Sequence, residues 1–280
     1  IFTAMISYRD IATGLQDLGL NRSTPVLAHI SMANLGEVKG GLNTLMGALL
    51  TAVDNVMMPT FTFSTMVIPE SGPEDNLMGY GSGRKTNLAA EVFSHNLPSD
   101  MPDREASEAL RAYPGVYRSN HPVFSFTGLG LDVALVNHPA EDPYAPIAEL
   151  RKLDGWVLLM GAEPSANFSV HYAEKLAGRK QFIRWALSAD GIREIPHYPG
   201  CSDGFHKFHY YMQEELHTVR VADSYWHAMK VDTLLNVAAA LIKDDGFALL
   251  CNNLNCPRCN LLRASIKAQY SRQWRPESQA

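Results

Sequence analysis

The sequence predicts an α/β fold, in which a β-sheet is covered by helices. Pro25 to Ile30 is a short apolar run typical of a buried strand, and Val56 to Phe63 is a second. Between them, apolar residues recur at i, i+3, i+4, i+7 and i+8, the spacing of one helical face: Leu42, Leu45, Met46, Leu49 and Leu50. A strand, a loop, a helix and a strand in this order form a βαβ unit, which is a building block of α/β sheets.

The other elements are expected in chain order around this unit. Residues 6–18 have the pattern of a helix. Residues 64–104 are rich in Gly, Pro, Asn and Asp and lack periodicity, so we expect a long surface excursion, a kind of loop that is usually functional or disordered. Four later elements are expected: a strand at Trp156 to Met160, a helix that opens near Ser169, a helix at Val231 to Lys243 and a strand at Phe247 to Leu250.

The composition is that of an ordinary globular chain. Of 280 residues, 46% are apolar and 19% are charged. The net charge of −5 and the pI of about 6.1 argue against a nucleic-acid partner, which needs a surplus of Lys and Arg. No apolar run approaches the roughly 20 residues that cross a bilayer, and residues 1–10 lack the features of a secretory signal. We therefore expect a cytoplasmic protein with reduced thiols and no membrane partner.

One domain is expected over residues 1–265, because the chain has no internal repeat and no low-complexity segment. A cysteine-containing C-terminal region at 197–262 belongs to this domain. A polar tail follows at 266–280.

The turn between the first strand and its helix is a candidate anion site. Glycines let a backbone come close to a ligand, and the following helix offers unpaired N–H groups and a positive dipole end. Lys39 adds a cation for a pyrophosphate. A plain tight turn is equally open, because the stretch matches neither a Walker A loop nor the G-x-G-x-x-G motif. The turn reads Leu35-Gly36-Glu37-Val38-Lys39-Gly40-Gly41.

A histidine and a glutamate share one face of the helix that opens near Ser169. With Asn167 or Ser169 as the N-cap, His171 falls in the first turn and Glu174 lies three residues further on. The carboxylate would fix the imidazole tautomer and stabilise the imidazolium, which makes His171 a candidate general base. A surface pair without function is the alternative, since ten histidines make chance pairings common.

The segment from Arg118 to Phe126 combines a cation, hydroxyls and a His-Pro step just before an apolar run. It fits a loop that enters a strand, and it also fits a loop that lines a ligand site. The residues alone leave both interpretations open.

All four cysteines lie in the C-terminal third of the chain. Their spacing, C-x₄-C-x₂-C with one distant partner, is typical of a structural tetrahedral zinc site. Free reduced thiols are the main alternative, and His197, His206 or His209 are candidates to replace one ligand. A cysteine nucleophile is disfavoured because no His–Cys pairing is indicated. The predicted zinc ligands are Cys201, Cys251, Cys256 and Cys259.

Five segments stand in one order along the chain: His29-Ile30-Ser31 with Leu35-Gly36 and Gly40-Gly41; Met58-Pro59-Thr60-Phe61-Thr62; Glu108, Arg111, Pro114-Gly115-Val116 and Arg118-Ser119-Asn120-His121-Pro122; Val157-Leu158-Leu159-Met160-Gly161; and His171-Tyr172-Ala173-Glu174. Together they resemble the antibiotic N-acetyltransferase family, typified by the aminoglycoside 3-N-acetyltransferases. The resemblance implies a three-layer α/β/α fold with a mixed central sheet, unlike the commoner GNAT acetyltransferase fold. It also implies direct, acetyl-CoA-dependent acetylation of the 3-amino group on the 2-deoxystreptamine ring of aminoglycoside antibiotics, as in antibiotic resistance.

The resemblance also implies roles for individual residues. His171 would be the general base, supported by Glu174. Acetyl-CoA would lie along the glycine turn and the segment 118–124. The implied cofactor contacts are His29, Ser31, Met32, Ala33, Leu35, Gly36, Val38, Lys39, Gly40, Gly41, Thr60, Arg118, Ser119, His121 and Phe124.

A cationic amine substrate would need carboxylates and aromatic faces. The excursion at 64–104 is the expected lid, and the candidates in or just after it are Glu70, Glu74, Asp75, Tyr80 and Glu108. The chain departs from the family at three places where hydroxyl groups are lost: around Ser31, at Phe168 and at Ala145-Pro146. These departures leave open a same-fold enzyme for another amine, such as a biosynthetic intermediate. A non-catalytic, zinc-stabilised binding module is the remaining alternative.

Overall fold

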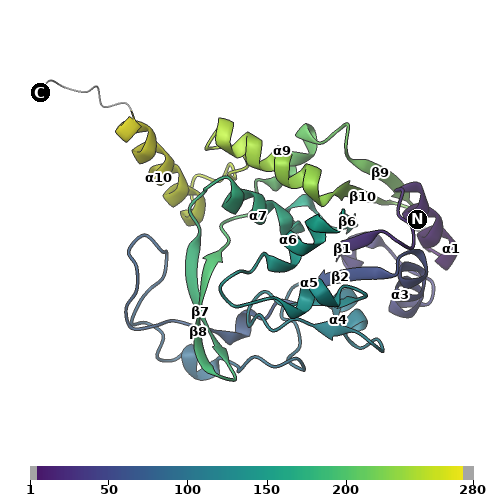
Figure 1. The fold of residues 1–280 in the computed structure, drawn as a ribbon, viewed down its shortest axis with the longest axis horizontal. Helices are drawn as coiled ribbons and strands as arrows, with labels where there is room; N and C mark the ends of the chain where they lie inside the picture. The colour runs from purple at the N-terminus through teal and green to yellow at the C-terminus, as the bar shows by residue number, and fades with distance from the viewer. Residues whose placement is uncertain (1–4, 274–280) are drawn as a thin grey trace, which may run out of the picture.

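The computed structural model describes residues 5–273 and has a seven-stranded sheet at its centre (Figure 1). The strands run in the order β4-β5-β2-β1-β6-β10-β9. The central strand β1 is parallel to both of its neighbours, and the other neighbouring pairs are antiparallel, so the sheet is mixed. The strand bounds are β1 Pro25–Ile30, β2 Asn55–Pro59, β4 Tyr117–Arg118, β5 Phe126–Leu129, β6 Trp156–Met160, β9 His217–Val221 and β10 Ser224–Lys230.

Helices cover both faces of this sheet. Successive strand residues point to opposite faces, so Val26 and Ala28 pack against one helical layer while Leu27 packs against the other. The first layer holds α1 (Tyr8–Asp17), α3 (Gly41–Ala52) and α4 (Glu105–Arg111). The second layer holds α5 (Asp132–Val136), α6 (Ala145–Lys152), α7 (Ser169–Leu176) and α9 (Val231–Asp244). This is the three-layer α/β/α architecture with a mixed sheet that the family resemblance implies.

A second, three-stranded antiparallel sheet stands beside the first (Figure 1). It consists of β3 (Met66–Val67), β7 (Phe182–Ser188) and β8 (Gly191–Tyr198). Its inner side chains, Phe182, Ala186 and Ile195, join the larger hydrophobic core. The short helices are α2 (Met32–Leu35) and α8 (Phe208–Tyr211), with single 3-10 turns at Phe63–Thr65, Asn87–Ala89, Pro164–Ala166 and Phe205–Lys207.

The excursion at 64–104 contains little regular structure, as predicted. Two asparagine side chains hold it in place, and each bonds both the N–H and the carbonyl of one other residue, as a neighbouring strand would. The Asn76 amide donates to the carbonyl of Ile183 at 2.9 Å and accepts from its N–H at 2.8 Å. Asn87 bonds both backbone groups of Ile68 in the same way, at 2.8 Å each. The excursion is therefore an ordered part of the second sheet's surroundings.

One prediction about the C-terminal region is wrong. Residues 247–250 form a turn instead of a strand, with Leu249 in the left-handed region at φ 61°; a short apolar run does not distinguish a strand from a buried turn. The tail predicted from residue 266 is helical through its first part, because α10 spans Pro257–Gln273. Residues 274–280 lie outside the described part. No helix within residues 5–273 is long and apolar enough to cross a membrane.

Candidate active site

A cavity of about 470 Å³ opens at the edge of the sheet where the parallel strands β1, β2 and β6 end. Residues 28–30 and 58–59 line it from two of these strands, and residues 162–168 line it from the loop between β6 and α7. The carboxyl edge of parallel strands is the usual ligand site in open α/β sheets. The lining includes two histidines, two carboxylates and one guanidinium: His29, His171, Asp103, Glu163 and Arg258.

His171 reaches this cavity from the first turn of α7. The N-cap position of α7 is Phe168 and has no side-chain cap, so both predicted N-caps, Asn167 and Ser169, are wrong. The side-chain oxygen of Asn167 accepts a hydrogen bond from the Ser169 N–H at 3.2 Å just before the helix. The His171 ring is 6% exposed and lies edge-on to Phe168 and Phe205, with centroids 5.8 and 4.7 Å away.

Glu174 sets the tautomer of this histidine. His171 Nδ1 lies 2.6 Å from Glu174 Oε2. Burial by itself would raise the pKa of Glu174, but the hydrogen bonds and charges of His171 and Arg179 outweigh it and hold the pKa below its ordinary value. An ionised carboxylate only accepts hydrogen bonds, so Nδ1 carries the proton and donates it. The lone pair of His171 then sits on Nε2, as a general base requires.

Arg179 completes a buried chain of three side chains that the sequence does not predict. Its Nη1 lies 2.7 Å from Glu174 Oε1, and both side chains are 2% exposed. Its Nη2 donates to the carbonyls of Gly246 and Ala248, so the guanidinium is fixed from behind. Arg179 stands five positions after Glu174, a spacing that does not place two residues on one helical face.

The turn after α7 brings these two residues together. Gly178 has φ 79°. Its N–H donates to the carbonyl of Lys175, and the N–H of Arg179 donates to the carbonyl of Glu174. These two bonds form a Schellman motif, in which a left-handed glycine reverses the chain at the helix end. A glycine soon after the histidine-containing turn is the signal from which Arg179 was predictable.

His29 contributes a neutral imidazole to the cavity. The ring is 5% exposed, and burial lowers its pKa to about 3. Its Nε2 has no hydrogen-bond partner among the described residues. His29 and Phe124 are the two predicted cofactor residues that line the cavity.

The other predicted cofactor residues lie around the cavity, outside its lining. Ser31 donates to the cavity carboxylate Asp103 at 3.2 Å. The glycine turn, from α2 to the start of α3, is largely exposed, and Gly40 stands at the helix start with φ 86°. The predicted contacts of this turn are Met32, Ala33, Leu35, Gly36, Val38, Lys39, Gly40 and Gly41. Their contact with a cofactor stays a prediction.

The polar members of the later segments bond to their own chain. Arg118 donates to the carbonyls of Thr60, His95 and Leu97. Three more side chains make comparable bonds: Thr60 Oγ1 to Thr127 Oγ1, Ser119 Oγ from the Phe126 N–H, and His121 Nδ1 from the N–H groups of Val123 and Phe124. These contacts position the strand and loop beside the cavity.

The predicted substrate residues are not gathered at this cavity. Glu70, Glu74 and Asp75 are exposed on the excursion, and the Tyr80 hydroxyl accepts from Asn76 at 2.6 Å. Glu108 is bound by Arg111 at 2.6 Å and accepts from the Ser99 N–H. Asp103 and Glu163, which do line the cavity, were not predicted because both stand in loops without a periodic pattern.

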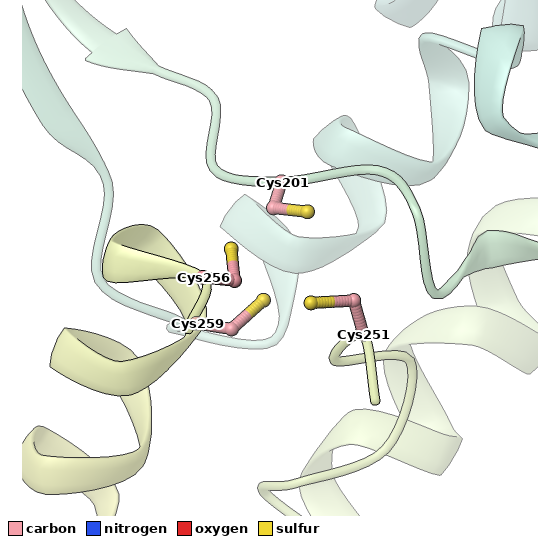
Figure 2. Close-up of side chains that lie close together, drawn as sticks. All are labelled: Cys201, Cys251, Cys256 and Cys259. Atoms are coloured by element: carbon pink, nitrogen blue, oxygen red, sulfur yellow. The ribbon is translucent and has the colours of Figure 1, made fainter. Parts of the chain in front are cut away.

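The four cysteines meet in a cluster at the start of α10. Cys201 follows β8, Cys251 follows the turn after α9, and Cys256 and Cys259 flank the first turn of α10. All four Sγ atoms lie within 4.8 Å of one another, and the side chains point toward a common centre (Figure 2). None is in a disulfide. The predicted set of thiols is therefore brought together as a candidate metal site.

Comparisons of the sequence with known proteins identify the family. A family model described as aminoglycoside 3-N-acetyltransferase matches residues 27–243. Aminoglycoside N(3)-acetyltransferase IX of Micromonospora chalcea is 32% identical over 184 residues, 61% of this chain and 63% of its own length. Aminoglycoside N(3)-acetyltransferase VII of Streptomyces paromomycinus is 33% identical over 194 residues, 65% and 66% respectively. The chain thus spans about two thirds of the length of these relatives.

Solved structures show the same fold. The apoenzyme of aminoglycoside acetyltransferase AAC(3)-IVa has a TM-score of 0.77 at 21% identity, covering 95% of this chain and 100% of that one. A mutant of that enzyme in complex with a gentamicin has a TM-score of 0.76 at 20% identity, covering 95% and 99%. A binary complex of AAC-IIIb with CoASH has a TM-score of 0.70 at 18% identity, covering 86% and 97%.

The protein thus has the three-layer fold of these acetyltransferases. With the family match over most of its length, the chain belongs to the aminoglycoside 3-N-acetyltransferase family.

Proposed function

We propose that this protein transfers an acetyl group from acetyl-CoA to the 3-amino group of the 2-deoxystreptamine ring of an aminoglycoside. The observation that carries the proposal is the chain Arg179–Glu174–His171, which ends with the free Nε2 of a histidine that lines the cavity. The family supports the reaction class. The relatives with bound CoASH and gentamicin support the two substrates.

The proposed chemistry follows from the charge of the amine. An alkyl ammonium is mostly protonated at neutral pH and has no lone pair for attack. The ammonium first releases one proton to solvent. As the neutral nitrogen attacks the thioester carbonyl carbon, His171 Nε2 takes a second proton from it, and the carbon–sulfur bond breaks. The imidazolium returns its proton to the leaving thiolate. Glu174 stabilises the imidazolium during this cycle, and Arg179 keeps Glu174 ionised.

Two carboxylates at the cavity support a cationic substrate. Asp103 and Glu163 both line the cavity and are both exposed, so they lie where an ammonium group meets the protein. Opposite charges at such a mouth attract the substrate and orient its other ammonium groups. Arg258 is the one guanidinium among the described lining residues. The amine that reacts at His171 would leave its neighbouring cations near Asp103 and Glu163.

The direct test is acetyl transfer by the purified protein. We expect thiol release from acetyl-CoA in the presence of a gentamicin-type aminoglycoside, and a singly acetylated product modified at the 3-amino group by mass spectrometry and NMR. Simpler amines serve as the comparison. Turnover of simple amines without turnover of any aminoglycoside would contradict the proposed substrate and favour a same-fold enzyme for another amine.

We also propose that the four cysteines hold a structural zinc ion. A tetrahedral zinc with bonds of about 2.3 Å places its sulfurs about 3.8 Å apart, within the spread of the cluster. Four thiolates and Zn²⁺ carry a net charge of −2, and three cations bond to backbone carbonyls beside the ligands: Lys207 to Leu250, Arg258 to Gly200 and Arg263 to Cys251. Such outer contacts orient ligands and offset charge.

Metal analysis of the purified protein tests this site. We expect about one zinc per chain, lost when Cys256 and Cys259 are both replaced by Ser. The chelated protein should expose four thiols to a thiol reagent. A metal-free protein with freely reactive thiols, or with a Cys256–Cys259 disulfide, would contradict the proposal.

A further inference from the structure

Residues beside the cysteines also line the cavity, and we call residues 198–202 together with Arg258 the C-terminal wall of the cavity. Cys201 stands between Gly200 and Ser202, and both of these neighbours line the cavity. Arg258 stands between Cys256 and Cys259 and lines the same cavity. Each half of the cluster is thus within one or two residues of the space in which we propose that the substrates meet.

Arg258 joins the two halves directly. Its Nη1 donates to the carbonyl of Gly200 at 3.1 Å, and its guanidinium lies over the ring of Tyr198, 5.8 Å from the centroid. The Tyr198 ring is 6% exposed, lines the cavity, and packs against Phe124 with centroids 5.2 Å apart. A displacement of the start of α10 would therefore be passed to the cavity lining through Arg258.

Little regular structure holds this wall. Strand β8 ends at Tyr198, and residues 199–202 belong to neither a strand nor a helix. The hydrophobic cluster beneath them has four buried members, two of which are cysteines: Leu250, Cys251, Cys259 and Leu262. So small a core does not supply much stability, and small units of this kind usually depend on a metal or another cross-link.

We propose that the metal site positions the amine-binding wall of the cavity, with Arg258 as the connecting residue. This inference rests on the proposed acetyl transfer and on the proposed zinc. The metal site is not bonded to the catalytic side chains: His171, Glu174 and Arg179 come from α7 and the turn after it, and their hydrogen bonds and ion pairs join them to one another and to backbone, not to a cysteine. Metal loss should therefore weaken amine binding more than it slows the chemical step.

The amine is the substrate expected to depend on this wall. The predicted cofactor residues that line the cavity, His29 and Phe124, come from β1 and from the loop before β5. The wall in question comes from residues 198–202 and from α10, which lies beyond the segment matched by the family model. A C-terminal wall of this kind adjusts acceptor specificity while the reaction machinery stays unchanged.

The experiment compares four forms of the full chain with the wild type: Cys256→Ser, Arg258→Ala, Arg258→Lys and Leu254→Ala. Leu254 is the matched control, because its side chain is 79% exposed on the loop between Cys251 and Cys256. Zinc content, kcat and the KM of each substrate are measured for each form. Hydrogen exchange of the backbone amides at 200–204 is measured in parallel, since it does not require activity.

We expect Cys256→Ser to lose zinc and Arg258→Ala to keep it. Both should raise the KM of the amine about tenfold, the size expected from loss of one charge-assisted hydrogen bond, with kcat and the KM of acetyl-CoA within about twofold of wild type. Both should also speed exchange of the amides at 200–204. Arg258→Lys should recover part of the affinity, and Leu254→Ala should match the wild type.

Two results would overturn the inference. In the first, zinc loss changes neither the KM of the amine nor the hydrogen exchange of this segment. In the second, only the KM of acetyl-CoA increases. Failure of the proposed reaction has a different signature. In that case no form turns over, while the zinc-dependent protection of the amides at 200–204 persists.

Discussion

At the scale of single residues, His171 carries the proposed proton transfer. Replacement by Ala should lower kcat by about 10²–10⁴, the usual contribution of a general base. Affinity for CoA, measured by calorimetry, should stay within about twofold, because the ring supplies a proton acceptor and no known cofactor contact. The exposed His206, replaced by Ala in the same way, should leave kcat unchanged. Near-wild-type turnover of the His171→Ala protein would refute the assignment.

Glu174 acts through His171, so its loss should cost less. Glu174→Gln keeps an acceptor oxygen for Nδ1–H but removes the charge that stabilises the imidazolium. We expect a decrease in kcat of about tenfold to a hundredfold, smaller than that of His171→Ala. Steady-state assays at saturating concentrations of both substrates measure this decrease in kcat. A decrease as large as that of His171→Ala would mean that Glu174 does more than support the base.

The two exposed carboxylates at the cavity should act electrostatically. Neutralising Asp103 or Glu163, as Asn or Gln, should raise the KM of a cationic aminoglycoside several-fold, and the effect should shrink with added salt. Asp190, which is exposed in the β7–β8 turn, is the control residue and should tolerate replacement by Asn. A salt-independent increase, or an equal effect at Asp190, would argue against an acidic mouth.

At the scale of elements, the turn after α7 connects local backbone geometry to the active site. Gly178 has φ 79° and open space where an added Cβ would lie, so Gly178→Ala adds backbone strain without a steric clash. The strain should lower the free energy of unfolding by about 1 kcal/mol. It should also lower kcat, because the same turn brings Arg179 to Glu174.

Gly191 provides a matched control for this substitution. It has φ 106°, also has open space around its Cβ position, and begins β8 directly after the β7–β8 turn. Gly191→Ala should cost similar stability, measured by denaturant unfolding, and leave kcat unchanged. If both variants lose stability and activity in proportion, the turn at Gly178 has only a structural role.

The same scale explains what was predictable from the sequence. The βαβ unit and the pair His171–Glu174 were predictable because their signals lie within one element or between adjacent ones. Arg179 was missed because its contact depends on the helix-ending turn. Asp103, Glu163 and Arg258 come from segments far apart in sequence that only the tertiary structure brings to one cavity. The acidic residues of the excursion were chosen by composition, and composition does not show whether a side chain points toward the cavity or into solvent.

At the scale of the whole molecule, buried neutral histidines make the fold sensitive to acid. His29 and His121 are buried, and burial lowers the pKa of each to about 3, whereas an unfolded chain has a histidine pKa near 6.5. Between these values the unfolded state binds more protons than the folded state. The free energy of unfolding should therefore fall as the pH drops from about 6.5 toward 3, by up to about 1.4 kcal/mol per pH unit for each histidine.

Urea unfolding between pH 7.5 and 5 measures this slope. His121→Asn tests the assignment, because the asparagine oxygen is able to accept the N–H groups of Val123 and Phe124 that His121 Nδ1 accepts, yet does not titrate. The free energy of unfolding of this variant should change less with pH than that of the wild type, by the contribution of one histidine. This holds even if the variant is less stable at pH 7.5. The exposed His206→Asn variant should keep the wild-type slope. Equal slopes in all three proteins would mean that the acid sensitivity arises elsewhere, with His138 the next group to test, because burial also holds its pKa well below the ordinary value of 6.5.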